Sequence, residues 1–326
     1  MDKETALKVF YETNEIDPIH VADPLDECYD KRLAELPRRV DQWLLGVEPE
    51  DREIFLNLLS KYCYLRRPQC QLRYGQILSL LRDRLSELQL DLSNVLVVTV
   101  EAGGPCASGG DNVRSDLRYR NLETLSKNQI IAVQAKLKEE DLATYRAVLF
   151  LDDVIGSGVT MWSSIQQLYK RFPVWLGRQK IFCAGIAPRK KGIDHVTKNC
   201  KNAQIPIEWL YDPTWVQDPA FCFGSPEYKK LERYEKIIGE YMTEPGKSFF
   251  MGFNKNRLLL SFYYNTPNNT LSTFWRIGVE MEPPFYRDGN QVGRPHLDDL
   301  RKRKAQLSKQ AYLFGIDRKN NKGNDD

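Results

Sequence analysis

The chain has 326 residues, and its 47 basic and 44 acidic side chains leave a formal net charge of +3 at pH 7, which excludes the global basic signature of a nucleic-acid-binding protein. With 42% hydrophobic residues it can bury a substantial core in one or two domains, yet no apolar run approaches the roughly 20 residues that span a bilayer. Seven scattered cysteines without a CxxC pair, and an N-terminus unlike a signal peptide, predict reduced thiols, a cytoplasmic protein and no membrane partner.

The first part of the chain, residues 1–90, has the periodicity of helices. Apolar residues recur at helical spacing, with charged residues between them, in 37–45, 54–64 and 77–90. No set of side chains with the pattern of a catalytic site occurs here. We therefore expect a helical region that covers a sheet or presents a surface to a partner.

The next part, residues 91–215, alternates strand and helix signals. Short apolar, β-branched runs predict strands, and helical patterns lie between them, as a parallel doubly wound sheet requires. The fold class is therefore α/β. The predicted strands are 95–100, 130–134, 148–151, 181–186 and 205–210.

A glycine-rich loop follows the first of these strands. Many glycines after a strand favour positive φ angles or a close approach of the backbone to a ligand, although a surface loop has the same composition. The loop residues that we treat as candidates for binding are Gly103, Gly104, Pro105, Cys106, Ala107, Ser108 and Gly109.

The most informative stretch surrounds the strand at 148–151. Two adjacent carboxylates, Asp152 and Asp153, follow the apolar run, and a small-residue turn leads into a helical pattern. Ligands of parallel sheets bind at the carboxyl ends of strands, and a glycine turn at a helix start directs free N–H groups at an anion. This combination suits a sugar phosphate, whose hydroxyls donate to the carboxylates. The turn residues expected to hold the phosphate are Gly156, Ser157, Gly158, Val159 and Thr160.

Beyond residue 215 the alternation stops, and residues 216–326 predict an α+β extension. A helix is expected at 227–241, and residues 262–275 combine aromatics with asparagines and threonines around one proline. Such side chains can read a base or an amide edge, or they can form an Asx-turn loop that closes on the core. The basic segment after residue 294 is typical either of a solvated terminal helix or of a helix that binds a partner or RNA.

The quoted motifs resemble those of a known superfamily. Residues 148–160 fill every defining position of the phosphoribosyl diphosphate signature of the type I phosphoribosyltransferases, and the glycine-rich loop is similar to the diphosphate loop of orotate-type members. Residues 265–270 resemble the Asn-Thr-Pro-Asn-Asn-Thr block of a phosphoribosyltransferase-like effector family of prokaryotic conflict systems, some encoded beside retron reverse transcriptases. The resemblance covers roughly residues 90–280.

This resemblance implies roles for the residues. Asp152 and Asp153 would hold the ribose hydroxyls as the catalytic pair, and the turn at 156–160 would hold the 5-phosphate. Mg²⁺ is the implied cofactor, bound to oxygens of the diphosphate and the ribose rather than to a protein metal cluster. Asn265, Thr266, Asn268 and Asn269 would form a hood over the ligand.

The resemblance leaves three functions open. The favoured one is an effector enzyme that acts on nucleotides or nucleobases in antiphage defence. Gly156 stands where purine-salvage members often carry an acid that assists proton transfer, so a sensor of phosphoribosyl diphosphate or a nucleotide without chemistry is the second. The third is a partner of a reverse transcriptase complex with RNA or DNA, or of another defence protein. Since superfamily members are often dimers, a homodimer is a further expectation.

Overall fold

The chain forms two units, each built from stretches that are separated in sequence. The computed structural model describes residues 1–100, 109–119, 125–133, 135–241, 248–277 and 281–287. The sheet unit combines Tyr62–Phe221 with Asn256–Thr270. The helical unit combines Met1–Lys61, Cys222–Lys255 and the described residues from Leu271 onward. The sequence, in contrast, predicts three consecutive segments with boundaries near 90 and 215.

The sheet unit contains a five-stranded sheet in which every pair of neighbours is parallel. The strand order is β3-β2-β4-β5-β6, so the chain winds outward in both directions from the centre. All five strands predicted from the sequence are present, which confirms the α/β class. Their bounds are β2 Val95–Thr99, β3 Ile130–Ala132, β4 Ala147–Ile155, β5 Lys180–Pro188 and β6 Ile207–Trp209.

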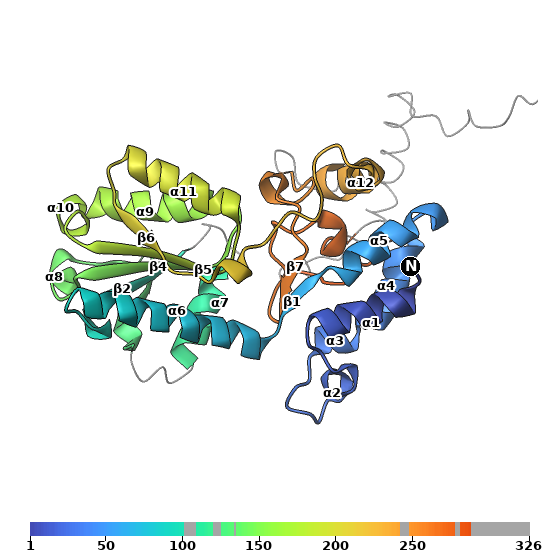
Figure 1. Cartoon of the computed structure of the whole chain (residues 1–326), viewed down its shortest axis with the longest axis horizontal. Coiled ribbons are helices and arrows are strands. Elements are labelled where there is room, and N and C mark those ends of the chain that lie inside the picture. The colour runs from blue at the N-terminus through green and yellow to red at the C-terminus, as the bar shows by residue number, and fades with distance from the viewer. Residues whose placement is uncertain (101–108, 120–124, 134, 242–247, 278–280, 288–326) are drawn as a thin grey trace, which may run out of the picture. The chain divides into compact units, whose positions relative to one another are not determined.

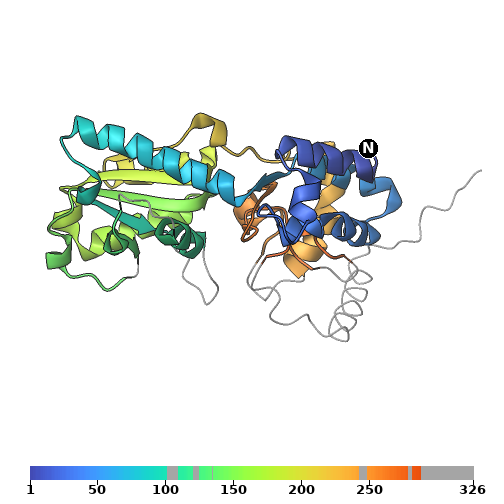
Figure 2. The ribbon, with the colours of Figure 1, turned by 90° about the horizontal axis from the view of Figure 1, so that it is seen from below.

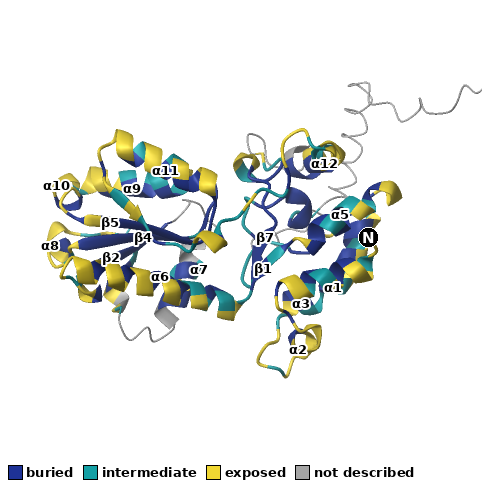
Figure 3. Cartoon of the chain, in the orientation of Figure 1, coloured by how far each residue is buried: buried dark blue, intermediate teal, exposed yellow. Residues whose placement is uncertain are grey.

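Helices cover both faces of this sheet (Figures 1 and 2). Leu149 and Leu151 of β4 pack with α6 and α7 on one face, whereas Val148 and Phe150 pack with α9 and α11 on the other. Buried residues line the strands, and exposed residues mark the outward faces of α9 and α11 (Figure 3). The sheet is therefore doubly wound, with apolar side chains in both directions, as buried parallel strands require. The helices are α6 Arg67–Glu87, α7 Gly109–Tyr119, α8 Glu139–Leu142, α9 Val159–Arg171, α10 Pro173–Leu176 and α11 Lys190–Asn202.

A second, two-stranded parallel sheet completes this unit. Strand β1 (Cys63–Leu65) pairs with β7 (Leu260–Phe262), and Cys63 stands opposite Leu260. The helix predicted at 54–64 is therefore too long. It ends at Ser60, because the last residues of that apolar run pair with a strand about 200 residues later in the chain. Leu260 and Phe262 belong to the same buried cluster as α6 and α7.

The helical unit packs helices around aromatic side chains. Trp43 lies against Phe55 and Phe274, with ring centroids 5.1 and 4.7 Å apart, and its indole N–H donates to the carbonyl of Thr273. The helices predicted at 37–45 and 227–241 are present, the second as α12 continued by a π-helical turn, Ile237–Tyr241. The helices are α1 Lys3–Thr13, α2 Pro18–Ala22, α3 Lys31–Ala34, α4 Leu36–Leu45, α5 Arg52–Ser60 and α12 Pro226–Lys236.

A buried carboxylate ties this unit together. Glu235 is fully buried, and its oxygens accept the backbone N–H groups of Met251 (2.9 Å), Ser272 (3.1 Å) and Thr273 (2.9 Å). Burial raises the pKa of Glu235 above its usual 4.5, and these three donors act in the opposite direction. The side chain thereby joins α12 to two segments that follow it in the chain.

Candidate functional site

The two acids of the signature lie within strand β4 rather than after it. The sequence predicts that the strand ends at Leu151, but β4 continues to Ile155 because β5 pairs with it to the end, with Asp152 opposite Gly185. Strand β2 pairs only as far as Leu151. The acids thus stand where one neighbouring strand has ended and the other continues, at the carboxyl edge of the sheet.

The electrostatics of this pair are unfavourable without a ligand. Asp152 is only 8% exposed, and one of its oxygens accepts the N–H of Asp153 at 3.0 Å. Burial raises the pKa of Asp152 well above its usual 3.8, and the charge of Asp153 raises it further. A ligand that brings hydroxyl donors would relieve this cost, because hydrogen bonds to the charged form lower a carboxyl pKa.

The turn after β4 forms the N-terminus of α9. Gly158 occupies the N-cap with φ +77°, a conformation suited to glycine, and no side chain caps the helix there. The first N–H groups of a helix lack partners within it, so this end favours an anion. The N–H of Val159 has only a long contact of 3.4 Å with the Ser157 hydroxyl. Gly156 and Gly158 are buried, while Ser157, Val159 and Thr160 retain exposure.

The turn is held by close backbone packing against α11. A side chain at Gly192 would come within 2.8 Å of the carbonyl oxygen of Gly156 and closer still to that of Ile155. The N–H of Arg189 donates to the carbonyl of Ile155 at 3.0 Å. Helix α11 therefore fixes the shape of the turn, and the sequence does not predict this contact.

Two residues of the segment 262–270 lie at the signature. The hydroxyl of Tyr264 donates to Asp153 Oδ2 at 3.1 Å, and the Asn269 amide lies against the α-carbon of Gly156. Burial and the charge of Asp153 raise the pKa of Tyr264 well above 10.0, so its hydroxyl keeps the proton that it donates.

The other predicted hood residues have different surroundings. Thr266 is fully buried, and its hydroxyl bonds that of Ser261 at 2.7 Å. The side-chain oxygen of Asn265 accepts the backbone N–H of Thr266, an Asx-type contact within the loop. Asn268 is half-buried. Asn269 is thus the member of this set with a contact at the signature turn.

Asn256 was missed from the sequence, whereas Tyr264 and Arg189 lie in stretches that the sequence singles out. Tyr264 and Asn256 lie in the segment that returns to the sheet unit, and Arg189 follows β5. The sequence suggests a solvated turn for the basic run at 189–191. Lys190 and Lys191 are exposed, but Arg189 is buried and donates to Asn256. In the sequence, only the position of Arg189 at the end of a predicted strand indicates that its side chain is buried and bonded rather than solvated.

The candidate diphosphate loop falls largely outside the described residues. Gly103, Gly104, Pro105, Cys106, Ala107 and Ser108 are among those the structure does not describe, and Gly109 begins α7. Within the described ranges, no group of three or more His, Cys, Asp or Glu side chains is placed to hold a metal ion.

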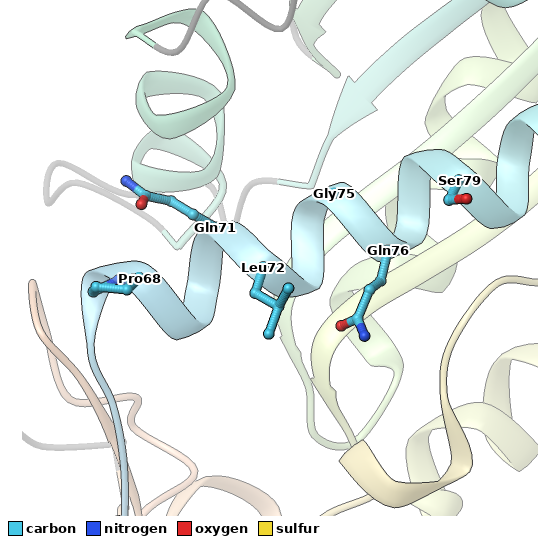
Figure 4. Close-up of a pocket in the computed structure, with 6 residues that line it drawn as sticks. All are labelled: Pro68, Gln71, Leu72, Gly75, Gln76 and Ser79. Atoms are coloured by element: carbon cyan, nitrogen blue, oxygen red, sulfur yellow. The ribbon is translucent and has the colours of Figure 1, made fainter. Parts of the chain in front are cut away.

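A separate hollow lies along α6, away from the signature in sequence. Pro68, Gln71, Leu72, Gly75, Gln76 and Ser79 line it and lie along this one helix (Figure 4). None of these residues carries a charge.

The comparison with protein families decides the assignment. The model of the PRTase-CE family, a phosphoribosyltransferase-like effector family, matches residues 40–287. The chain belongs to the PRTase-CE family. The match spans both units and includes the acids, the turn and the hood segment of this PRTase-CE protein. Neither the search of curated proteins nor that of solved structures found a match. No helix in the described part of this PRTase-CE chain is long and apolar enough to cross a membrane.

Proposed function

We propose that this PRTase-CE protein binds phosphoribosyl diphosphate, or a related nucleotide, at the end of β4. The observation that carries the proposal is the placement of two adjoining carboxylates a few residues before an uncapped helix N-terminus. Carboxylates accept hydrogen bonds from the hydroxyls of a ribose, and the free N–H groups at the N-terminus of α9 donate to its 5-phosphate. The raised pKa of Asp152 supports the proposal, because such shifts gather at functional sites.

In the proposed reaction, an acceptor such as a nucleobase forms a bond to C1 of the ribose as the bond from C1 to diphosphate breaks. The diphosphate leaves with the electron pair, the proton that the acceptor nitrogen loses passes to the leaving diphosphate, and positive charge develops at C1 in between. Asp152 and Asp153 stabilise that charge through a fixed negative field, while the turn at 156–160 holds the phosphate in place. Mg²⁺ bound to oxygens of the ligand would neutralise the leaving diphosphate.

The same site also fits a sensor that binds the ligand without chemistry. Gly156 supplies no acid, and the Asn269 amide lies where a side chain at that position would extend. A proton acceptor for the incoming base is therefore not provided by the turn. Product formation from phosphoribosyl diphosphate and a mixture of nucleobases distinguishes the enzyme from the sensor.

We propose that the protein acts as an effector in antiphage defence, in the cytoplasm. A reverse transcriptase complex with RNA or DNA, another defence protein, or a second copy of the chain would then control it. As an enzyme it would deplete a nucleotide pool of infected cells by running the proposed reaction in reverse or by hydrolysis. Family membership supports the effector role. Co-purification of RNA with the protein would favour the complex with nucleic acid.

Calorimetric titration of phosphoribosyl diphosphate with Mg²⁺ into the full chain tests the binding proposal. Asp152→Asn/Asp153→Asn should weaken binding by about a hundredfold or more, because two charge-assisted hydrogen bonds are lost. Asp83→Asn/Asp194→Asn is the matched control, since both acids are exposed on helices of the same unit. Equal binding by wild type and both double variants would overturn the proposal.

A further inference from the structure

Two carboxamides from the returning segment converge on the signature turn. A β-carbon built on Gly156 would lie 3.0 Å from Nδ2 of Asn256 and nearer still to the amide of Asn269. Both amides therefore occupy the space that a side chain at position 156 would fill. Asn269 is half-buried, whereas Asn256 is fully buried.

The hydrogen bond from Arg189 fixes the orientation of the Asn256 amide. One guanidinium nitrogen of Arg189 donates to the side-chain oxygen of Asn256 at 2.5 Å and to its backbone carbonyl at 2.9 Å. Since a guanidinium can only donate, the atom of Asn256 that faces it must be the oxygen. Nδ2 is then a donor directed toward Gly156, and no described residue accepts a hydrogen bond from it. An unsatisfied buried donor is uncommon in native proteins.

The charge behind this donor is positive. Arg189 is 6% exposed, and its pKa is lowered first by burial and then by the charge of Arg257, while the exposed Asp218 acts weakly in the opposite direction. A guanidinium bound to the oxygen of an amide polarises the amide and strengthens its N–H groups as donors. Arg189, Asn256 and Asn269 thus present donors and positive charge to one point beside Gly156.

We propose that Asn256 and Asn269, backed by Arg189, form a subsite for a hydrogen-bond acceptor oxygen of the ligand held at the α9 N-terminus. This subsite stands where an acid side chain at position 156 would otherwise be. It differs in chemistry from an acid at that position, because a carboxylate accepts a proton whereas the amide nitrogens of Asn256 and Asn269, which lie nearest to Gly156, donate hydrogen bonds. The inference rests on the proposed function, since it concerns the ligand of the same turn.

The acceptor oxygen has two sources, a phosphoryl group or a carbonyl of a base. Ribose 5-phosphate carries only the first, and uridine 5-monophosphate carries both. Calorimetric titration of each probe with Mg²⁺ into the full chain separates them. The variants are Asn269→Ala, which removes the outer donor, and Asn269→Asp, which replaces it by an acceptor. Asn202→Ala and Asn202→Asp are controls at an exposed position of α11.

We expect Asn269→Ala to weaken binding by about tenfold and Asn269→Asp by more, with both controls unchanged. A loss for both probes assigns the oxygen to the phosphoryl group, and a loss for uridine 5-monophosphate alone assigns it to the carbonyl. Wild-type affinity of both Asn269 variants for both probes overturns the subsite.

Thermal unfolding gives a second measurement that needs no ligand. Asn269→Asp places an acceptor beside the Asn256 donor, so the Tm should rise relative to Asn202→Asp. If wild type binds neither probe, the proposed function fails, and a raised Tm still supports the donor subsite. A Tm that is unchanged or lowered, together with no binding, overturns both.

Discussion

Each unit of the protein contains a buried carboxylate whose pKa is raised, and these two side chains, Glu235 and Asp152, differ in their partners. Glu235, in the helical unit, accepts three backbone N–H groups within 3.1 Å. Asp152, in the sheet unit, accepts one backbone N–H and stands beside a second carboxylate. Both have a raised pKa, with burial as the largest cause. Burial and a raised pKa therefore do not by themselves identify a functional acid.

The groups that surround each buried acid indicate whether it has a structural or a functional role. A buried carboxylate that is surrounded by backbone donors stabilises the fold around it. One that is placed next to another negative charge costs stability, and protonation or a bound ligand removes that cost. On this basis we expect Glu235 to be a structural residue and Asp152 to be a binding residue, and substitutions should affect the two in opposite directions.

The largest effect is expected for Glu235→Leu. Three buried N–H groups lose their acceptor, which should lower the free energy of unfolding by about 3–5 kcal/mol. Denaturant unfolding followed by tryptophan fluorescence measures the loss, because Trp43 and Trp275 lie in the same unit. Glu232→Ala is the control, since this residue of the same helix makes only a surface ion pair with Lys236. Equal losses in the two variants would contradict the distinction.

Asp152→Asn should act in the opposite direction. Removal of a charge that is buried beside Asp153 should raise the free energy of unfolding by about 1 kcal/mol at pH 7, while ligand binding falls. Thermal unfolding and calorimetric titration of the same preparation measure the two changes. A destabilised variant that still binds the ligand would show that Asp152 is structural.

The gain from Asp152→Asn should depend on pH. The pKa of Asp152 is raised in the folded state above 3.8, so the folded protein binds the proton more tightly than the unfolded chain does. Wild-type stability therefore falls as the pH rises through 3.8 and continues to fall until the folded pKa is passed. The difference between variant and wild type should vanish below pH 3.8. A gain that persists at that pH would point to packing rather than charge.

The smallest effect is expected for Tyr264→Phe. Loss of the hydroxyl that donates to Asp153 should lower the free energy of unfolding by about 1 kcal/mol, since the bond is partly buried and its acceptor is charged. Ligand affinity should also fall, because Asp153 loses the contact that orients it. Denaturant unfolding and titration measure both changes, with Tyr169→Phe on the exposed side of α9 as control. No change in either quantity would remove Tyr264 from the site.

Much of the sheet unit is predictable because its signals are local. The five strands follow from β-branched apolar runs, and the turn at 156–158 follows from glycine at a helix start. Strand β4 is longer than its apolar run because its last residues, including Asp152, are paired through the backbone with β5. Backbone pairing of this kind does not depend on the type of side chain, so the end of this strand could not be located from the sequence.

The missed features are those that depend on residues far apart in sequence. Strand β1 is part of an apolar run that looks helical, and only its pairing with β7 makes it extended. Arg189 belongs to a basic run that is typical of a solvated turn, and only its contact with Asn256 explains its burial. Such contacts depend on how the chain returns to the sheet unit, which no local pattern contains.

That return has a consequence for synthesis of the protein. The sheet unit needs Asn256–Thr270, and the helical unit needs residues from Leu271 onward although it begins at Met1. During translation, strand β1, which contains Cys63, therefore cannot pair until Leu260 of β7 has been synthesised. The sheet unit cannot be finished until Thr270 has left the ribosome, and the helical unit needs residues later still. A prematurely terminated chain would carry both signature acids without the segment that brings Tyr264, Asn256 and Asn269 to them.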